Sequence, residues 1–458
     1  MTTVDQLHRT MKLELDQGRA GTVEEAEALT ATYVLQIAVG TDIAASPTRQ
    51  AMLMTAINAG ARAFRGGVRI HGDLNWTITT GWGAGARAAD IVTSLGGVAG
   101  DSLDAAHPTL TIGRCARVVP GAIVLHLTWN GWAGGAVTSA ESRLDESAEF
   151  TVAGVLAGAL GVSEAFQHQR GSLLAGRRTV GLSLWDPNAE WASDAAAGPE
   201  LRFLPTRLWL LGLGHLGQAY AWALGYLPYG DRRQVEFTLQ DYDHVVEANR
   251  STGMLVANST PNGVRKTRLV AGALERLGFH TRLIERAFDY TTKPSRDEPI
   301  WALAGFDSPA PRCHLDNFEL AVDLGLGASQ DDYLGIHLHT FPAAGSPADI
   351  FVAAADDDTT GRSVEASPHS PWATAAAEDA CGVVQLEGAS VGAAFVGATA
   401  AAFGLAEVLR ALAGGPPIAI ASLTLAAPQH AEFVLGNVTA TGNPGFQSVR
   451  QSESHRLQ

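Results

Sequence analysis

The chain has 458 residues, 46% of them hydrophobic, so it is long and apolar enough to bury the cores of two or three domains. Its formal net charge of -15 argues against a large nucleic-acid interface, which needs clustered Lys and Arg. The three cysteines, Cys115, Cys313 and Cys381, include no Cys-x-x-Cys pair, which disfavours both a disulfide framework and a structural zinc site.

Neither a signal peptide nor a membrane span is expected from the sequence. The N-terminus is polar, and the charge-free stretch between Glu387 and Glu407 consists mostly of small residues. This composition favours a buried helix over a membrane-spanning one. We therefore expect a cytoplasmic protein.

Strand and helix patterns alternate through the first 170 residues, after an acidic amphipathic arm over residues 1–30. This alternation predicts parallel α/β layers. No glycine fingerprint occurs here, so we interpret residues 1–200 as a degenerate Rossmann-like or recognition domain that ends in a connector over residues 168–205. The expected strands are Tyr33–Val39, Gly67–His71, Thr109–Ile112 and Ile123–Leu127, and the expected helices are Thr48–Phe64, Arg87–Leu95 and Phe150–Gln167.

Residues 201–458 carry a second α/β pattern, which we interpret as a nucleotide-binding Rossmann domain. A loop at about 342–381 is long for a compact domain, and we expect either a functional segment or a solvated acidic insertion. Two strands near the C-terminus predict a hairpin, followed by a frayed end from Gln447. The expected strands before that hairpin are Arg207–Leu211, Val235–Gln240, Thr281–Glu285, Pro299–Leu303, Leu320–Leu324 and Tyr333–Phe341, with a helix at Lys266–Leu277.

A glycine motif, Gly212-Leu-Gly214-His-Leu-Gly217, follows the first strand of this second domain and opens a helix. Gly212 permits a tight turn, Gly214 lets a phosphate approach the backbone, and Gly217 allows close packing of helix and strand. The free amides and the dipole at the helix N-terminus favour an anion. Asp241 after the next strand suits a ribose hydroxyl, which both dehydrogenases and adenylating enzymes require.

Four further motifs follow in order: Asp241-Tyr-Asp243-His-Val245 with Asn249, then Gly263-Val-Arg-Lys266, then Asp307 with Arg312 five residues later, and last Cys381 ahead of a small-residue helix ending in Ala406-Glu407. This ordered set resembles the ThiF/MoeB/HesA superfamily, the bacterial relatives of ubiquitin-activating enzymes. The resemblance covers residues 207–413, about half of the chain. The missing Cys pairs place the chain in a zinc-free branch.

The resemblance implies an adenylyltransferase that uses ATP and Mg²⁺ to activate the C-terminal carboxylate of a small carrier protein or peptide. It implies that Lys266 faces the triphosphate, that Asp307 holds Mg²⁺, and that Arg312 pairs with a phosphate or braces Asp307. Asp243, Asn249 and Arg250 would help to bind the nucleotide. Lys266 is one of only three lysines in a chain with 32 Lys and Arg residues, which favours a functional role for it.

Three departures from the family pattern concern this site. His215 stands where the family has Gly, and Thr252 where it has Arg; Arg250 is the nearby substitute. Lys266 is also one residue further from Asn249 than in the relatives. These changes affect the triphosphate contacts but leave the pairing of a cation with Asp307 and Mg²⁺ in place.

Cys381 is a candidate for a second step, in which a thiolate attacks the acyl adenylate. The neighbouring Glu378 and Asp379 raise a thiol pKa and oppose this reactivity, so a small buried residue is the equal alternative.

Members of the superfamily also work as pairs of Rossmann units, so the resemblance implies a homodimer or an internal pseudo-dimer. In the second case residues 30–170 would supply an Arg to the ATP site, and Arg49, Arg62 and Arg65 are candidates by charge.

Three other functions compete with carrier activation. They are adenylation of another carboxylate by a tRNA-cyclising or peptide-adenylating relative, a non-catalytic peptide-recognition protein, and an NAD-dependent oxidoreductase. The last of these explains Gly212 to Asp241 but not Lys266, Asp307 and Arg312 in that order.

Overall fold

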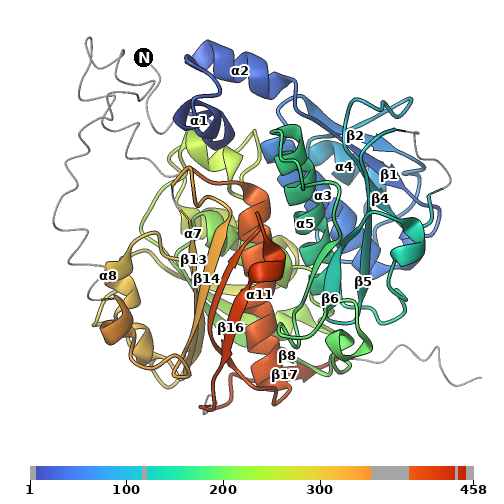
Figure 1. The fold of residues 1–458 in the computed structure, drawn as a ribbon. Coiled ribbons are helices and arrows are strands. Elements are labelled where there is room, and N and C mark those ends of the chain that lie inside the picture. Colours follow the sequence, from blue (N-terminus) through green and yellow to red (C-terminus); the bar gives the residue numbers. More distant parts are fainter. Residues whose placement is uncertain (1–6, 116–120, 328, 352–390, 439–441, 450–458) are drawn as a thin grey trace, which may run out of the picture.

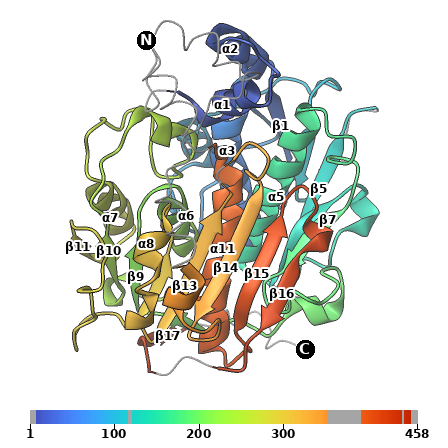
Figure 2. The same ribbon diagram turned by 60° about the vertical axis from the view of Figure 1, so that its left-hand side comes forward.

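The chain folds into two β-sheets whose parallel strands follow the same order (Figures 1 and 2). The computed structural model describes residues 7–115, 121–327, 329–351, 391–438 and 442–449. The first sheet has the order β3-β2-β1-β4-β5-β6-β7, and the second β11-β10-β9-β12-β13-β14-β15-β16. In each sheet the first five strands are parallel and the following ones antiparallel. The predicted α/β class, with a Rossmann-like domain in each half, is confirmed.

Most strands lie close to where the sequence predicts them, but β3, β6 and β7 were not predicted. In the N-terminal sheet they are β1 Val34–Val39, β2 Gly67–His71, β3 Gly97–Ala99, β4 Thr109–Ile112, β5 Val124–Asn130, β6 Ala133–Val137 and β7 Val180–Ser183. In the C-terminal sheet they are β9 Arg207–Leu211, β10 Glu236–Gln240, β11 His280–Ile284, β12 Trp301–Ala304, β13 Leu320–Leu326, β14 Gly335–Phe341, β15 Ile418–Thr424 and β16 Glu432–Leu435. The central strands β1, β4 and β12 are buried along their whole length, as expected of parallel strands covered on both faces.

The helices cover these sheets and begin at recognisable signals. Ser46 caps α3 by accepting a hydrogen bond from the Arg49 amide, and Pro47 occupies its first turn. The described helices are α1 Arg9–Asp16, α2 Val23–Ala31, α3 Pro47–Ala63, α4 Ala88–Ser94, α5 Thr151–Gln169, α6 His215–Leu224, α7 Lys266–Arg276, α8 Pro309–Arg312 and α11 Ala394–Leu412.

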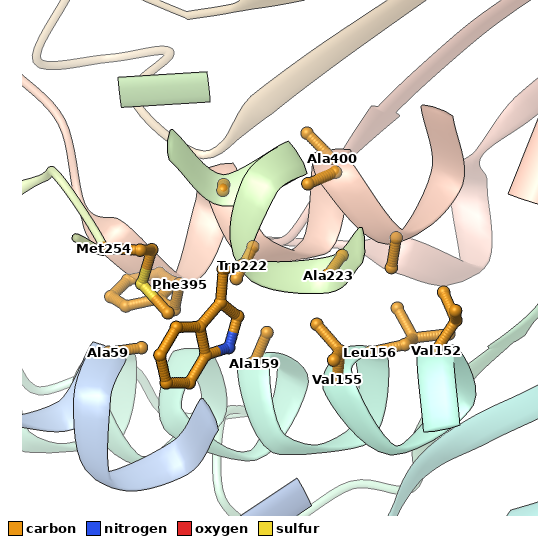
Figure 3. Packing of buried hydrophobic residues seen from close by; sticks show 14 of the residues in the cluster. Ala59, Val152, Val155, Leu156, Ala159, Trp222, Ala223, Met254, Phe395 and Ala400 are labelled. Atoms are coloured by element: carbon orange, nitrogen blue, oxygen red, sulfur yellow. The ribbon is translucent and has the colours of Figure 1, made fainter. Parts of the chain in front are cut away.

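Helices α3, α5, α6 and α11 lie between the two sheets and join the halves into one core (Figures 1 and 3). Glycines on α5 let the backbone of α3 come close. A Cβ at Gly158 would lie 2.6 Å from the Met52 carbonyl oxygen, and a Cβ at Gly154 would overlap that of Thr48. Larger residues would separate the helices, so this small-residue surface sets how closely the halves pack.

The helix predicted before Glu407 is α11, and it is a core helix. It is long and apolar enough to span a bilayer, but 89% of its apolar window is buried within the protein. The neighbouring hairpin of β15 and β16 is antiparallel, as predicted.

Three local predictions were wrong. The connector at 168–205 contains β7. This strand has only two apolar residues, with a glycine between them, which are too few to show a period in the sequence. The strand expected to end at Leu127 is longer, because β5 continues to Asn130. The frayed end expected over Gln447–Gln458 begins later, since β17 Phe446–Ser448 forms a ribbon with β8 Phe203–Pro205, and residues 450–458 lie outside the described part.

Trp222 of α6 fills the interface between the halves and should be a sensitive probe of it (Figure 3). Its ring stacks on Trp82 at 5.5 Å between centroids, and its Nε1 donates to Thr55 Oγ1 at 2.9 Å. We expect Trp222→Ala to lower the free energy of unfolding in urea by about 3–5 kcal/mol, since it leaves a cavity and a buried hydroxyl without its donor. Leu173→Ala, at a side chain that is 86% exposed, should change it by no more than about 0.5 kcal/mol. Equal effects would contradict the importance of this interface.

Candidate nucleotide-binding site

A cavity of about 550 Å³ lies at the carboxyl ends of β9, β10 and β12. The strand order changes direction between β9 and β12, because β10 and β11 lie on one side of β9 and β12 lies on the other. Open α/β sheets bind their ligands at such a point. The structure brings eight of the residues proposed from the sequence to its wall: Gly212, Gly214, Asp241, Asp243, Asn249, Lys266, Asp307 and Arg312.

The glycine turn has the geometry that its motif predicts. Gly212 has a φ of 75°, in the left-handed region, and a Cβ at Gly217 would overlap the Gly212 carbonyl oxygen. Gly214 precedes α6, whose first-turn amides therefore face the cavity. A Cβ at Gly214 would make an ordinary contact of 4.0 Å with Lys266 Nζ, so the lysine lies directly beside the turn.

Asp241 joins two backbone segments as well as lining the cavity. Its Oδ2 accepts from the Leu213 amide at 2.6 Å, and its Oδ1 accepts from the Asp243 amide at 2.7 Å. Because a carboxylate has about four acceptor positions, it still has capacity for a ribose hydroxyl. Asp241 thus fixes the glycine turn relative to the loop after β10.

Lys266 forms an ion pair with Asp243 across the cavity wall. The Nζ lies 2.8 Å from Asp243 Oδ2, and the lysine amide donates to the Asp243 carbonyl oxygen at 3.0 Å. The side chain of Lys266 is 12% exposed and that of Asp243 is 43% exposed. The lysine is therefore held in place at the start of α7, while its partner remains hydrated.

Asp307 and Arg312 follow β12 on the opposite side of the glycine turn. The Asp307 carboxylate makes no hydrogen bond or ion pair with the residues that the structure describes. Arg312 donates through Nη2 to the Phe306 carbonyl oxygen, and its Nε lies 3.6 Å from Asp323 Oδ1. Arg312 is thus braced from behind, whereas Asp307 is left to interact with a ligand.

The residues at Asp307 fit a magnesium ion that arrives with phosphates. In the described part of the chain, no three His, Cys, Asp or Glu side chains gather as a metal site. Mg²⁺ is commonly bound through one or two carboxylates together with substrate phosphates. The single carboxylate of Asp307, which has no partner among the described residues and borders the cavity, therefore suits it.

Asn249 and Arg250 differ in their relation to the cavity. Asn249 lines it, and its Oδ1 also accepts from the Val246 amide at 2.9 Å. Arg250 is not among the lining residues, because its guanidinium pairs with Glu247 and donates to the carbonyl oxygens of Ala257 and Thr260. Arg250 therefore braces the loop and does not replace the family Arg at Thr252.

Arg9 supplies a cation to the cavity that the sequence analysis missed. It lies at the start of α1 and lines the cavity, and its backbone amide donates to Ser251 Oγ at 3.3 Å. The three arginines suggested for this role serve elsewhere: Arg62 binds the carbonyl oxygens of Gly253 and Val256, Arg65 pairs with Glu27, and Arg49 with Asp42 and Glu146. Arg9 could not be identified from the sequence, because it stands in no motif and no hydrophobic period indicates where its side chain lies.

His215 also lines the cavity and explains one departure from the family glycine motif. Its imidazole packs against α11, where a Cβ at Gly397 would overlap Nε2. Burial lowers the pKa of His215 to about 4, so the ring is neutral near pH 7. A side chain replaces the usual glycine here because α11 carries a glycine opposite it.

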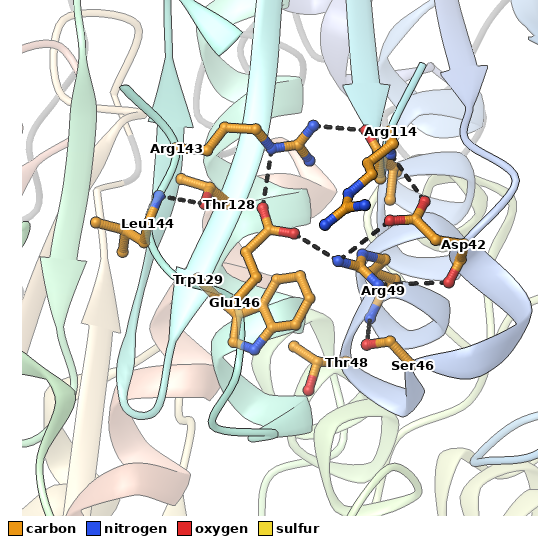
Figure 4. A network of polar contacts seen from close by, with 12 residues as sticks. Asp42, Ser46, Thr48, Arg49, Arg114, Thr128, Trp129, Arg143, Leu144 and Glu146 are labelled. Carbon is orange, nitrogen blue, oxygen red and sulfur yellow. Dashed lines mark hydrogen bonds and ion pairs between the residues drawn. The ribbon is translucent and has the colours of Figure 1, made fainter. Parts of the chain in front are cut away.

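The corresponding point of the N-terminal sheet is occupied by charged side chains (Figure 4). Arg49 pairs with Asp42 at 3.3 Å and with Glu146 at 2.8 Å, and Glu146 also accepts from Arg143 Nε at 2.9 Å. The Asp42 carboxylate accepts from the Arg114 amide at 2.8 Å, at the end of β4. This internal network leaves a cavity of only about 180 Å³, lined by Arg49, Arg143 and Glu146, in the half whose sequence has no glycine fingerprint.

The ordered motifs and this fold are those of an E1-like protein of the ThiF/MoeB/HesA superfamily, and the cavity lies in its C-terminal half. Cys381 lies outside the described residues. Family models for the BilD N-terminal domain and the BilD C-terminal domain match residues 34–184 and 204–415. The chain is 37% identical over 434 residues to the bacterial E1-like protein BilD of Collimonas sp. (strain OK412), covering 93% of both chains. The chain belongs to the BilD family.

Solved structures with a similar fold include two proteins of E. coli. MccB matches 55% of this chain and 68% of its own, with 14% identity and a TM-score of 0.33. The tRNA N6-threonylcarbamoyladenosine dehydratase TcdA matches 46% of this chain and 88% of its own, with 15% identity and a TM-score of 0.29.

The lowered pKa of His215 predicts a pH-dependent contribution to stability. Because its folded pKa of about 4 lies below the unfolded value near 6.5, its stabilising contribution is complete above pH 6.5 and is lost as the pH falls toward 4. We expect the unfolding free energy of the wild type, relative to His215→Gln, to decrease between pH 7 and pH 4.5. His430→Gln, at an exposed histidine, is the control and should run parallel to the wild type. A constant difference between wild type and His215→Gln would contradict the assignment.

Proposed function

We propose that the protein adenylates a C-terminal carboxylate with ATP. One observation carries this proposal. The cation Lys266 and the carboxylate of Asp307, which has no partner among the described residues, lie on opposite sides of a glycine turn that opens a helix. A dehydrogenase needs the turn and Asp241 but has no use for this pair. The relative's description as an E1-like protein supports the same activity.

The reaction joins a carboxylate oxygen to the α-phosphorus of ATP and breaks the bond to the oxygen that bridges the α- and β-phosphates. Pyrophosphate leaves with that electron pair, and an acyl adenylate forms. Negative charge spreads over the phosphate oxygens in the transition state, so fixed cations around the cavity lower the barrier. Lys266, Arg9 and Arg312 lie on its wall and can meet different parts of the triphosphate.

Lys266 would exchange its partner Asp243 for the triphosphate when ATP binds. In the absence of nucleotide its charge is balanced by Asp243 at 2.8 Å. When a triphosphate attracts the ammonium, the Asp243 carboxylate is rehydrated, because 43% of that side chain is already exposed. Lys266 therefore exchanges one negatively charged partner for another and is not left without a counter-charge.

Mg²⁺ would be held by Asp307 together with the phosphates, and when bound it neutralises charge on the departing pyrophosphate. Asp241 would accept a ribose hydroxyl while keeping its two backbone bonds. Asn249 faces the cavity beside the glycine turn and can contact a phosphate oxygen through its amide nitrogen.

The acceptor that best fits the family is a ubiquitin-like or sulfur-carrier protein, or a peptide, with a free C-terminal carboxylate. In a second step the thiolate of Cys381 would attack the acyl carbon and release AMP, which forms a thioester. A non-catalytic peptide-recognition protein is the other class of function. It would need neither Lys266 nor Asp307, and both lie at the cavity.

Exchange of labelled pyrophosphate into ATP tests the first step. The assay uses the full chain, Mg²⁺ and a small Gly-Gly-ended protein encoded beside the gene. Asp307→Ala and Lys266→Ala should each slow exchange by roughly 100-fold or more, because each removes a charge that the transition state needs. Arg9→Ala should slow exchange as well, whereas Lys293→Ala, at an exposed lysine outside the cavity, should leave it at the wild-type rate. Exchange that survives Asp307→Ala unchanged would rule out this mechanism, and tight NADH binding without ATP binding would favour the oxidoreductase.

The second step has its own test. Cys381→Ala should abolish a carrier adduct that thiol reagents cleave, while pyrophosphate exchange continues at the wild-type rate. Cys313→Ala is the matched control, because Cys313 is partly buried beside the cavity segment and is assigned no chemistry. Persistence of the adduct in Cys381→Ala would leave this cysteine without a catalytic role.

A further inference from the structure

Arg312 belongs to a buried charged cluster whose other members have no part in the chemistry proposed above. Asp323 of β13 and His339 of β14 lie directly opposite each other in the antiparallel pair of strands. Asp323 Oδ1 lies 3.6 Å from Arg312 Nε, and Asp323 Oδ2 lies 4.0 Å from His339 Nδ1. The Asp323 side chain has no exposure to solvent, and that of Arg312 is 15% exposed.

The Asp323 carboxylate is in an unfavourable place for a charge. Among the described residues, neither of its oxygens accepts a hydrogen bond. Burial raises the pKa of Asp323 to about 6, against the opposing influence of Arg312. A buried carboxylate with so little compensation is poor evidence for a stabilising role. Its neighbour in the ion pair is the cavity residue Arg312, which indicates a role in the site.

His339 does not compete with Arg312 for this carboxylate. Burial lowers the pKa of His339 to about 4, with Arg312 and His337 adding to the effect, so the imidazole is neutral near pH 7. The ring packs edge-on against Phe351 at 5.3 Å between centroids. It therefore closes the far side of Asp323 without adding a charge.

The guanidinium of Arg312 is confined on several sides. Nη2 donates to the Phe306 carbonyl oxygen, and the Phe351 ring lies 5.7 Å from Cζ. On β13, a Cβ at Gly325 would stand 3.0 Å from Nη1, which is closer than most contacts of this kind. These contacts confine the Arg312 guanidinium to one position at the edge of the cavity, and the absence of a side chain at Gly325 leaves room for it there.

We propose that Asp323 is a positioning residue, which, with His339 behind it and Gly325 beside it, holds the Arg312 guanidinium in the orientation that carboxylate activation requires. This inference rests on the proposed adenylation. Asp323 acts from beneath the cavity and is not among its lining residues. It orients the cation that meets the developing charge, as a carboxylate behind a catalytic group commonly does.

The test separates positioning from folding by comparing two conservative variants. Asp323→Asn keeps the size of the side chain and removes its charge, whereas Gly325→Ala keeps every charge and displaces the guanidinium. We expect Asp323→Asn to lower the kcat of pyrophosphate exchange 10- to 100-fold, with KM for ATP within 3-fold of wild type and with an unchanged or higher melting temperature. Gly325→Ala should lower kcat 3- to 10-fold without loss of the fold. A role confined to folding would instead lower the melting temperature and the amount of active protein together, with kcat per active molecule unchanged.

Chemical rescue adds a readout that a structural role would not move. Guanidinium chloride at millimolar concentration should partly restore exchange to Arg312→Ala, and the double variant Arg312→Ala/Asp323→Asn should not respond. Equal rescue of both variants, or wild-type kcat in Asp323→Asn, would overturn the proposal.

A measurement independent of activity distinguishes this failure from failure of the proposed function. The Arg312 Nε–H resonance of ¹⁵N-arginine-labelled protein, assigned by its loss in Arg312→Ala, should be slow to exchange in the wild type and broadened or fast to exchange in Asp323→Asn. If the wild type exchanges no pyrophosphate but this change is seen, the adenylation proposal fails and the positioning of Arg312 stands. If the resonance is identical in both proteins, Asp323 does not hold the guanidinium.

Discussion

The Asp241 carboxylate holds together the two loops on which the site is built. By accepting from the amides of Leu213 and Asp243 it ties the turn after β9 to the loop after β10. Asp243 in turn receives the amide and the ammonium of Lys266, which begins α7. One buried acidic side chain therefore helps to set the distance between the N-terminus of α6 and Lys266. A backbone hydrogen bond from the Gly212 amide to the Gln240 carbonyl oxygen, at 3.0 Å, adds to this connection.

The same constraint explains why the two halves share a strand order but not a site. In the N-terminal half an acidic residue, Asp42, also stands near the first strand end, but it accepts from the Arg114 amide and pairs with Arg49. Glu146, held at a φ of 56°, brings a second carboxylate to the same arginine. These charges neutralise one another in place and leave a cavity of only about 180 Å³, against about 550 Å³ in the C-terminal half. The larger cavity is bordered by Asp243, which is 43% exposed, and by Asp307, which has no partner among the described residues.

Much of this organisation could be predicted from the sequence, since it depends on local signals. The glycine turn, the strands on either side of it and the spacing to Asp307 are encoded within short segments, and the structure brings these residues to one wall. Arg250 shows the limit of such reasoning: it stands close to the expected position in the chain, but the loop turns its guanidinium toward Ala257 and Thr260. Asp323 could not have been found either, because its pairing with Arg312 depends on how α8 packs against β13.

Arg9 shows how far the site depends on contacts between distant parts of the chain. Helices α1 and α2 share a small apolar cluster, and Leu13 and Leu29 pack them against the main core. Charge adds to this packing, because Glu14, with no exposed side-chain surface, accepts from Arg170 Nε at 2.6 Å at the end of α5. The next anchor is the bond from the Arg9 amide to Ser251, in the loop that carries Asn249. Arg170 of the N-terminal half thus holds α1 through Glu14, and Ser251 of the C-terminal half binds the start of α1 beside the cavity. A Rossmann unit cut at residue 204 would keep its glycine turn and Lys266 but would lose this cation, so both halves are needed for the complete site.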